Sequence, residues 1–269
     1  MVDISIILPT IRISTLKKVC DSIAAACQRY SYEIIIISPY NLPSELHQEN
    51  IKYIKSFASP SCCIQMGSLL CNSKYWFDFA DDALLKENIL DNMIDYYEIN
   101  NLQQYNLLSL NLSEGTLDAE TLEPLPNLET HSLHSGFFEV AYNPPFWKKC
   151  INRNWKLSLN FIVRTSSFLK IGGFDTSFEF HNFCLHDFAF RCQNLGGQII
   201  TFPESGLYVS HRPEETKDHG PVHLAQKGPD TDRFNEIYDN LTDVRDRAFL
   251  DINNWKYQKY SSWWSRRFG

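Results

Sequence analysis

Two adjacent aspartates, Asp81 and Asp82, are the side chains whose type and position point most directly to chemistry. They follow the apolar run Tyr75–Phe79, which predicts a buried strand, after a single alanine. In an open parallel sheet, ligands bind beyond the carboxyl ends of the strands, so acids placed there face the ligand crevice. Carboxylate oxygens are hard ligands for Mn²⁺ and Mg²⁺, ions that neutralise a diphosphate leaving group. The pair therefore predicts a metal-diphosphate site.

The same two acids have a purely structural interpretation. Ala83-Leu84-Leu85 follows them, and acidic residues are common where a helix begins because they complement the helix dipole. Taken alone, the pair is compatible with both interpretations.

The elements that must position this pair alternate between strands and helices. Ile4–Leu8 and Glu33–Ile37 are apolar throughout, which is typical of strands buried on both faces, and Ser14–Tyr30 between them has a helical apolar face. This order predicts a parallel α/β sheet with right-handed crossovers. Further strands are predicted at 51–54, 105–112, 157–164, 198–202 and 206–210, and further helices at 64–72, 84–99, 166–171 and 185–195. The proline-interrupted stretch 113–156 is predicted to be irregular.

Length, charge and cysteine usage limit the classes of protein to which the chain can belong. A chain of 269 residues can bury one substantial core with a small appendage. Its net charge of −7 argues against a sequence-independent nucleic-acid grip, so no nucleic-acid partner is expected. The eight cysteines form no CxxC pair, and the sequence shows no signal peptide and no apolar run long enough to span a membrane. We therefore expect reduced thiols and a cytoplasmic location.

Several short motifs follow one another along residues 2 to about 211: Pro9-Thr10-Ile11-Arg12, Gln65-Met66-Gly67, Asn72-Ser73-Lys74-Tyr75, Ala80-Asp81-Asp82, Asn160–Arg164, Ile171-Gly172-Gly173-Phe174-Asp175 and His186–Arg191. Their order resembles the family-two glycosyltransferases of the GT-A fold. The resemblance implies an α/β fold of GT-A type, a mostly parallel open sheet flanked by helices, with a C-terminal helical extension. It also implies a hexosyltransferase-type enzyme.

The resemblance implies roles for individual residues. Asp82 would be a ligand of Mn²⁺ or Mg²⁺, Asp81 would share the metal or hold the ribose, and His211 would be a further ligand. Asp187 would be the general base of an inverting transfer, and we expect its apolar neighbours Phe183 and Phe188 to raise its pKa. Donor contacts would come from Pro9, Thr10, Arg12, Gly67 and Asp81, and the acceptor side would include Gly173, Phe174 and His186.

Each of these residues also has an ordinary structural interpretation. Asp187 can cap a helix that begins near it, and the Gly172-Gly173 pair can end a helix. A lone Arg12 in a loop is often solvated, and a lone His211 after a strand is often a surface or core residue.

The chain departs from the family pattern in two places. The second strand of the family usually ends in acids that recognise the nucleobase, whereas Ser38-Pro39-Tyr40 stands here. At the position of the general base, where the family has Glu-Asp, this chain has His186-Asp187. The expected partners are a nucleotide-sugar donor, with a UDP-sugar favoured, and a saccharide or other hydroxyl acceptor.

The predicted division is a glycosyltransferase domain at 1–211, with a donor half at about 1–100 and an acceptor half at about 101–211, and a C-terminal extension at 212–269. The extension has a helical apolar pattern around Phe234 and Tyr238. Its aromatic and basic end, Trp255–Phe268, suits either peripheral contact with a membrane surface or packing on the domain or on a second subunit. An oligomer is compatible with this pattern.

The leading hypothesis is a metal-dependent inverting glycosyltransferase. One alternative is a non-catalytic relative that binds a nucleotide or glycan, suggested by the missing second-strand acids. Another is a nucleotidyltransferase, but Pro9–Ile13 lacks the glycine-rich phosphate loop expected after its first strand.

Overall fold

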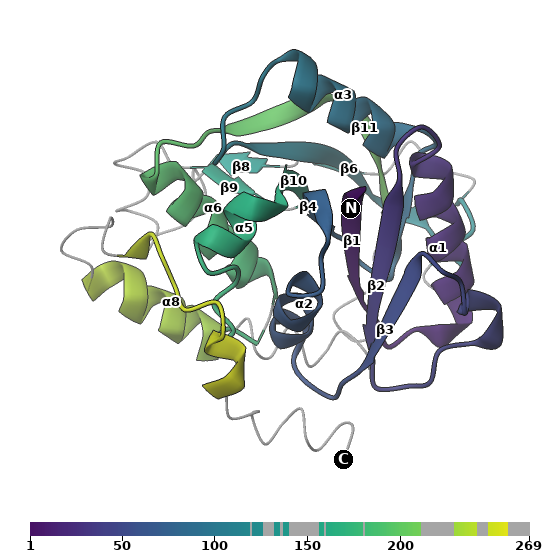
Figure 1. The fold of residues 1–269 in the computed structure, drawn as a ribbon, viewed down its shortest axis with the longest axis horizontal. Coiled ribbons are helices and arrows are strands. Elements are labelled where there is room, and N and C mark those ends of the chain that lie inside the picture. Colours follow the sequence, from purple (N-terminus) through teal and green to yellow (C-terminus); the bar gives the residue numbers. More distant parts are fainter. Residues whose placement is uncertain are drawn as a thin grey trace.

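A mixed β-sheet with helices on both faces forms the body of the protein (Figure 1). The computed structural model describes residues 1–118, 120–125, 132–134, 137–139, 156–158, 160–179, 181–210, 229–240 and 247–257. The expected α/β architecture, a large sheet flanked by helices, is confirmed in these residues.

The amino-terminal half of the sheet is parallel. Its strands lie in the order β3 (Ile51–Lys55), β2 (Tyr32–Ser38), β1 (Val2–Pro9) and β4 (Ser73–Asp78). The intervening helices are α1 (Ile13–Ala26), η1 (Ser44–Leu46) and α2 (Pro60–Ser68). β1 pairs in parallel with both β2 and β4, and β2 pairs in parallel with β3. The residues that follow these four strands therefore share one edge of the sheet, where ligands are expected to bind.

The second half of the sheet mixes strand directions. It continues as β10 (Phe161–Arg164), β6 (Leu107–Leu117), β11 (Ile199–Ser210) and β5 (Ala83–Leu85), with β7 (Ser132–His134) paired to β6. β10 runs antiparallel to both neighbours, β11 runs parallel to β6, and β5 runs antiparallel to β11. A separate pair is formed by β8 (Phe137–Glu139) and β9 (Lys156–Ser158).

Helices cover both faces of the sheet, which is why its central strands are apolar on both sides. The helices beyond the parallel half are α3 (Ile89–Ile99), α5 (Thr165–Lys170), α6 (His181–Asn194) and α8 (Pro229–Asn240). α1 and α3 share one buried cluster with Ile4, Ile6 and Leu8 of β1. α2, α5 and α6 share the other with Ile7 of β1 and with Trp76, which stacks on Phe168 at 4.3 Å between ring centroids.

Several element boundaries differ from the sequence predictions, and two of the differences change how acids are interpreted. Residues 83–85 form a strand paired with β11, and α3 begins only at Ile89, so Asp81-Asp82 does not open a helix. The helix-start interpretation of that pair is wrong. α6 begins at His181, so Asp187 lies in the helix interior and the capping interpretation is also wrong. The strands expected at 198–202 and 206–210 are one bulged strand, β11. The prediction that 113–156 is irregular throughout is also wrong, because β6 runs to Leu117 and β7 and β8 lie within this stretch.

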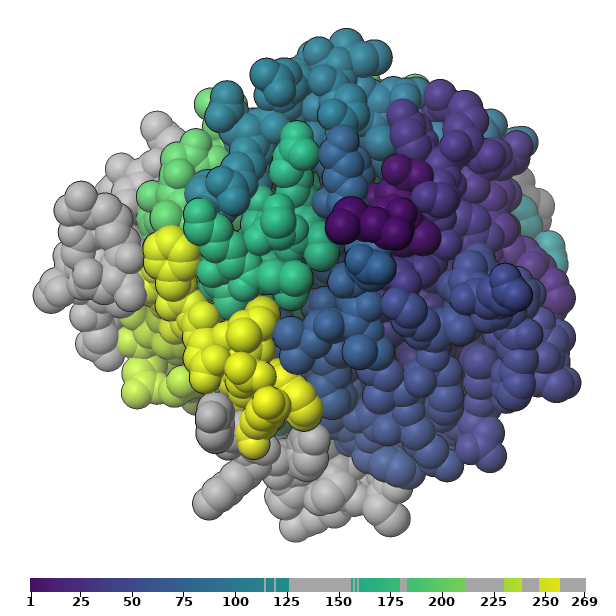
Figure 2. Space-filling view, in the orientation of Figure 1, coloured from purple at the N-terminus to yellow at the C-terminus, as the bar shows by residue number. Residues whose placement is uncertain are grey.

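The described part of the C-terminal extension packs on the second face of the sheet. Phe234 and Tyr238 of α8 are buried in the same cluster as α6. Residues 247–257, ending in η4 (Asn254–Tyr257), lie between the surfaces of α5 and α2, as Figure 2 shows for the yellow segment. The helical pattern predicted around Phe234 is therefore confirmed, whereas 258–269 lies outside the described residues. No helix among those described has both the length and the apolar character needed to cross a membrane.

Candidate functional site

The carboxyl ends of β1 and β4 bring Thr10, Arg12 and Asp81 into one polar cluster. Thr10 Oγ1 donates to Asp81 Oδ2 at 2.8 Å, and the Ile11 N–H donates to the same oxygen at 3.1 Å. The Arg12 guanidinium pairs with Asp81 Oδ1 and lies 4.0 Å from Asp82 Oδ2. The side chains of Arg12, Asp81 and Asp82 are each only 10–11% exposed. The fold thus joins two predicted donor motifs that lie far apart in the sequence.

Backbone hydrogen bonds tie this cluster to the neighbouring strands. The Thr10 N–H donates to Ile37 O of β2 at 2.9 Å, and the Arg12 N–H donates to Thr10 Oγ1 at 3.0 Å. The Ser210 N–H, at the end of β11, donates to Asp82 O at 2.9 Å. The cluster is therefore held by the ends of β1, β2, β4 and β11.

The charge of the cluster limits what it can bind. Among the described contacts, one guanidinium faces two carboxylates, and these carboxylates repel a further negative group such as a diphosphate. Both Asp81 oxygens already accept hydrogen bonds, from Thr10, Ile11 and Arg12. In the part of the chain that the structure describes, no group of three or more potential metal-binding side chains occurs. The predicted ligand His211 lies outside the described residues.

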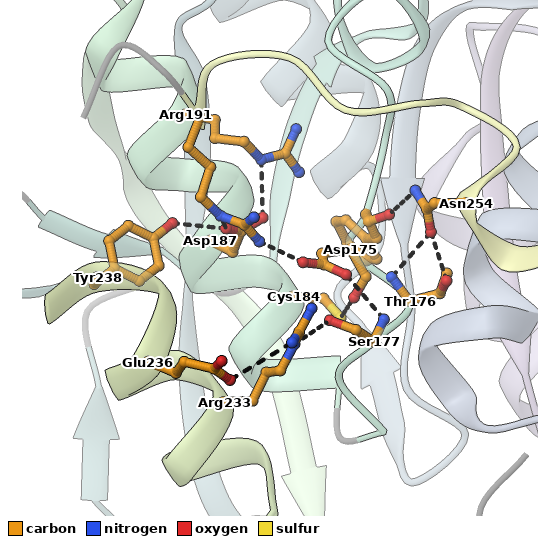
Figure 3. A network of polar contacts seen from close by, with 12 residues as sticks. Asp175, Thr176, Ser177, Cys184, Asp187, Arg191, Arg233, Glu236, Tyr238 and Asn254 are labelled. Atoms are coloured by element: carbon orange, nitrogen blue, oxygen red, sulfur yellow. Dashed lines mark hydrogen bonds and ion pairs between the residues drawn. The ribbon is translucent and has the colours of Figure 1, made fainter. Parts of the chain in front are cut away.

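On the acceptor side, Asp187 is enclosed in a network of charges (Figure 3). Its side chain is 0% exposed. Arg191 Nε donates to Oδ2 at 2.8 Å, while Tyr238 Oη and Arg247 Nε donate to Oδ1 at 2.6 and 2.8 Å. Burial by itself raises the pKa of Asp187, but the charges of Arg247 and Arg191 outweigh it, so the pKa lies below its usual value. The expectation that the apolar setting gives a raised pKa is wrong in its net direction.

Arg191 carries this network onto the turn that contains the glycine pair. It is fully buried and donates to Ile171 O at 2.9 Å and to Gly173 O. The Asp187–Arg191 pair thereby fixes the turn after α5. In this arrangement an acceptor hydroxyl cannot contact Asp187, so its role as a general base stays a prediction that requires Tyr238 and Arg247 to move.

The 247–254 segment is bonded to the same turn. The Leu250 N–H donates to Ile171 O at 3.0 Å, and Gln65 Nε2 of α2 donates to Gly172 O at 3.1 Å and to Ile252 O at 2.9 Å. Asn254 Nδ2 donates to Phe174 O at 2.8 Å, and Arg247 also pairs with Asp175. Figure 3 shows Asn254 beside Thr176, whose N–H donates to Asn254 Oδ1 at 3.1 Å. The C-terminal segment is thus bonded to the turn after α5 and to α2.

The remaining predicted residues lie in packed surroundings. Pro9 ends β1 directly before the polar cluster. Gly67 lies in α2, where an added Cβ would come within 2.7 Å of Ile37 and 2.8 Å of Ile7, so close packing alone explains the glycine. Phe174 is fully buried among aromatic rings, and His186 is half-buried on α6. Their donor and acceptor roles stay predictions.

Sequence reasoning missed Tyr238, Arg247 and Asn254 as partners of the acceptor-side turn. The helical pattern marked Tyr238 only as an apolar position, and nothing local distinguishes Arg247 or Asn254. Their partners lie 51–80 positions away, beyond the reach of any local pattern.

Gly172→Ala tests the attachment of the C-terminal segment. Gly172 has φ +90°, and an added Cβ would lie 2.1 Å from Leu250 O, so the segment must be displaced. The matched control is Gly196→Ala, because Gly196 has a similar φ of +85° but no atom within 4 Å of an added Cβ. Both variants place a side chain at positive φ and share that strain, but the clash with Leu250 O is expected to make Gly172→Ala cost about 1–3 kcal/mol more in urea unfolding. Equal losses would mean that the segment contributes no stability at this turn.

Comparison with known proteins supports the architecture. No protein-family model and no curated protein matches the chain. Among solved structures, S. aureus TarS 1-349 in complex with UDP aligns with a TM-score of 0.50 and 12% identity over 88% of this chain and 71% of that chain. The likeness is one of fold. S. aureus TarS 1-349 without UDP gives a TM-score of 0.49 and 11% identity over 77% of this chain, which spans only 60% of that chain. This chain therefore shares the mixed α/β fold of TarS.

Proposed function

We propose that this protein transfers a sugar from a nucleoside-diphosphate sugar to a hydroxyl acceptor. The observation that carries the proposal is the Thr10–Arg12–Asp81–Asp82 cluster at the carboxyl edge of β1 and β4. This is the edge where open α/β sheets bind ligands. The UDP complex of the fold neighbour TarS supports a UDP-sugar as the donor.

On the donor side, Arg12 would exchange its pairing with Asp81 for the diphosphate, to which a guanidinium can bond with two donors. Asp82 and His211 would hold Mn²⁺ or Mg²⁺, and Asp81 would share the ion. His211 directly follows Ser210 in the sequence. When bound, the ion would neutralise charge on the leaving diphosphate.

On the acceptor side, an inverting transfer needs a base that touches the attacking hydroxyl. Asp187 can serve only in a form in which Arg247 and Tyr238 have released its Oδ1. We propose this opened form as the reactive one, with the Gly173-Phe174 turn and His186 bordering the acceptor.

The decisive experiment is release of nucleoside diphosphate from UDP-, GDP- and other nucleotide-sugars, with Mn²⁺ and with a chelator. Wild type is expected to release one diphosphate in Mn²⁺. Asp82→Asn removes a proposed metal ligand and is expected to lose at least about 10- to 100-fold in rate, the loss that follows when a residue supporting a metal ligand is removed. Asp21→Asn is the control, because that carboxylate is exposed on α1 and pairs only with Lys17 among the contacts described. No release from any donor with mixed acceptors present would contradict transfer.

The enclosure of Asp187 favours one second candidate, a relative that binds the nucleotide without turnover. Its signature would be tight UDP binding, lost in Asp82→Asn, with no diphosphate release from any donor. A nucleotidyltransferase has no comparable observation in its favour.

A further inference from the structure

Two exposed aromatic side chains follow neighbouring strands at the ligand-binding edge of the sheet. Tyr40 comes two residues after the end of β2 and is 48% exposed, and Phe57 comes two residues after the end of β3 and is 49% exposed. Ser38 and Lys55, the last residues of these strands, are paired in register. Large aromatic side chains are usually buried for much of their surface. Two exposed ones at the ligand-binding edge of the sheet are therefore candidates for contact with a ligand.

Hydrogen bonds hold the two turns against each other. The Ser56 N–H donates to Ser38 O at 3.0 Å, and Tyr53 Oη of β3 donates to Tyr40 O at 2.5 Å. Lys55 Nζ donates to Asn41 Oδ1 at 3.0 Å. Tyr40 and Phe57 therefore stand on a firm backbone and would lose little freedom on binding a flat ligand.

The spacing of the strands sets the distance from these aromatics to the polar cluster. Asp81 follows β4 and Arg12 follows β1, while Tyr40 follows β2, the next strand along. Neighbouring strands are about 4.8 Å apart, so Tyr40 stands roughly 10 Å along the edge from Asp81. A nucleoside diphosphate covers such a span from its base to its terminal phosphate. The Thr10 N–H bond to Ile37 O joins the end of β1 to β2 along this path.

We propose that Tyr40 and Phe57 form a stacking surface for the nucleobase of the donor, in place of acids that would read its edge. The proposal rests on the proposed function and deepens it. Stacking uses the π-face that every base has, whereas an acid selects bases by their hydrogen-bond donors. The donor site should therefore accept several nucleobases and choose its donor mainly through the sugar and diphosphate.

The test is calorimetric binding of UDP and of inorganic pyrophosphate, both with Mn²⁺, to wild type, Tyr40→Ala, Phe57→Ala and Tyr40→Phe. Each alanine variant is expected to weaken UDP binding roughly 5- to 150-fold, the usual worth of one base-aromatic stack, and to leave pyrophosphate binding unchanged. Tyr40→Phe should bind UDP as wild type does. Phe249→Ala is the matched control, because Phe249 is 54% exposed in the C-terminal segment.

The outcomes distinguish failure of the stacking surface from failure of the proposed function. If wild type binds UDP and both alanine variants bind it equally well, the stacking surface is overturned and the proposed function stands. If wild type binds neither UDP nor pyrophosphate, the proposed function fails and the stacking surface with it. CDP, GDP and ADP should differ from UDP in affinity by less than the loss caused by Tyr40→Ala, and a larger preference would overturn the predicted tolerance of bases.

Discussion

Replacing Asp187 with alanine is expected to lower the free energy of unfolding by about 3–5 kcal/mol. The change leaves Arg191, which is fully buried, without its carboxylate partner and removes an acceptor from Arg247 and Tyr238. A buried charge without compensation is costly because it has neither water nor an ion partner. Urea unfolding followed by tryptophan fluorescence measures the loss.

A double variant gives the control for this prediction. Asp187→Ala combined with Arg191→Met removes both charges of the pair, so part of the stability should return relative to Asp187→Ala alone. An unfolding midpoint that stays at the wild-type value in Asp187→Ala would contradict the anchoring role derived from the network.

Activity measurements distinguish a structural role of Asp187 from its proposed role as general base. Asp187→Asn removes the basic carboxylate, whereas Arg191→Met disturbs the same network and keeps it. If transfer per folded molecule falls in Asp187→Asn but persists in Arg191→Met, Asp187 acts as the base. Equal losses in the two variants would mean that Asp187 only positions the turn at Gly173.

Asp78→Asn is expected to stabilise the protein at pH 8. Asp78 ends β4, and its Oδ1 has no hydrogen-bond partner among the described residues. Burial raises the pKa of this carboxyl from 3.8 to about 7. Between these values the folded chain holds a proton that the unfolded chain has lost, so stability falls as pH rises through this window. The asparagine amide stays neutral throughout, and the gain at pH 8 is at most ~4 kcal/mol.

The pH dependence of the gain is the measurement that checks this prediction. Urea unfolding at pH 4 and at pH 8 should show a small difference between wild type and Asp78→Asn at the lower pH and a large one at the higher. Asp21→Asn changes an exposed carboxylate and should show no such dependence. A constant difference at both pH values would mean that folding does not raise the pKa of Asp78.

The alternation of strands and helices could be predicted because it rests on local patterns. Ile34–Ile37 is apolar throughout since helices cover both faces of β2, and the helical face of α1 repeats with the period of a helix. The residues at which elements begin and end could be predicted less well. Ala83–Leu85 favours a helix by composition, but its pairing with β11, more than 120 positions later, makes it a strand.

The sequence by itself determined the fold class and placed Asp81-Asp82 after a strand, because both follow from patterns a few residues long. Only the tertiary structure decided that Arg12 neutralises one of these acids, that Asp187 is enclosed, and that Tyr40 and Phe57 share an edge. Arg247 reaches Asp187 across 60 positions and Arg12 reaches Asp81 across 69. Such contacts form when segments far apart in the sequence pack together, and local composition does not indicate them. The partners of each acid are therefore known only from the folded chain.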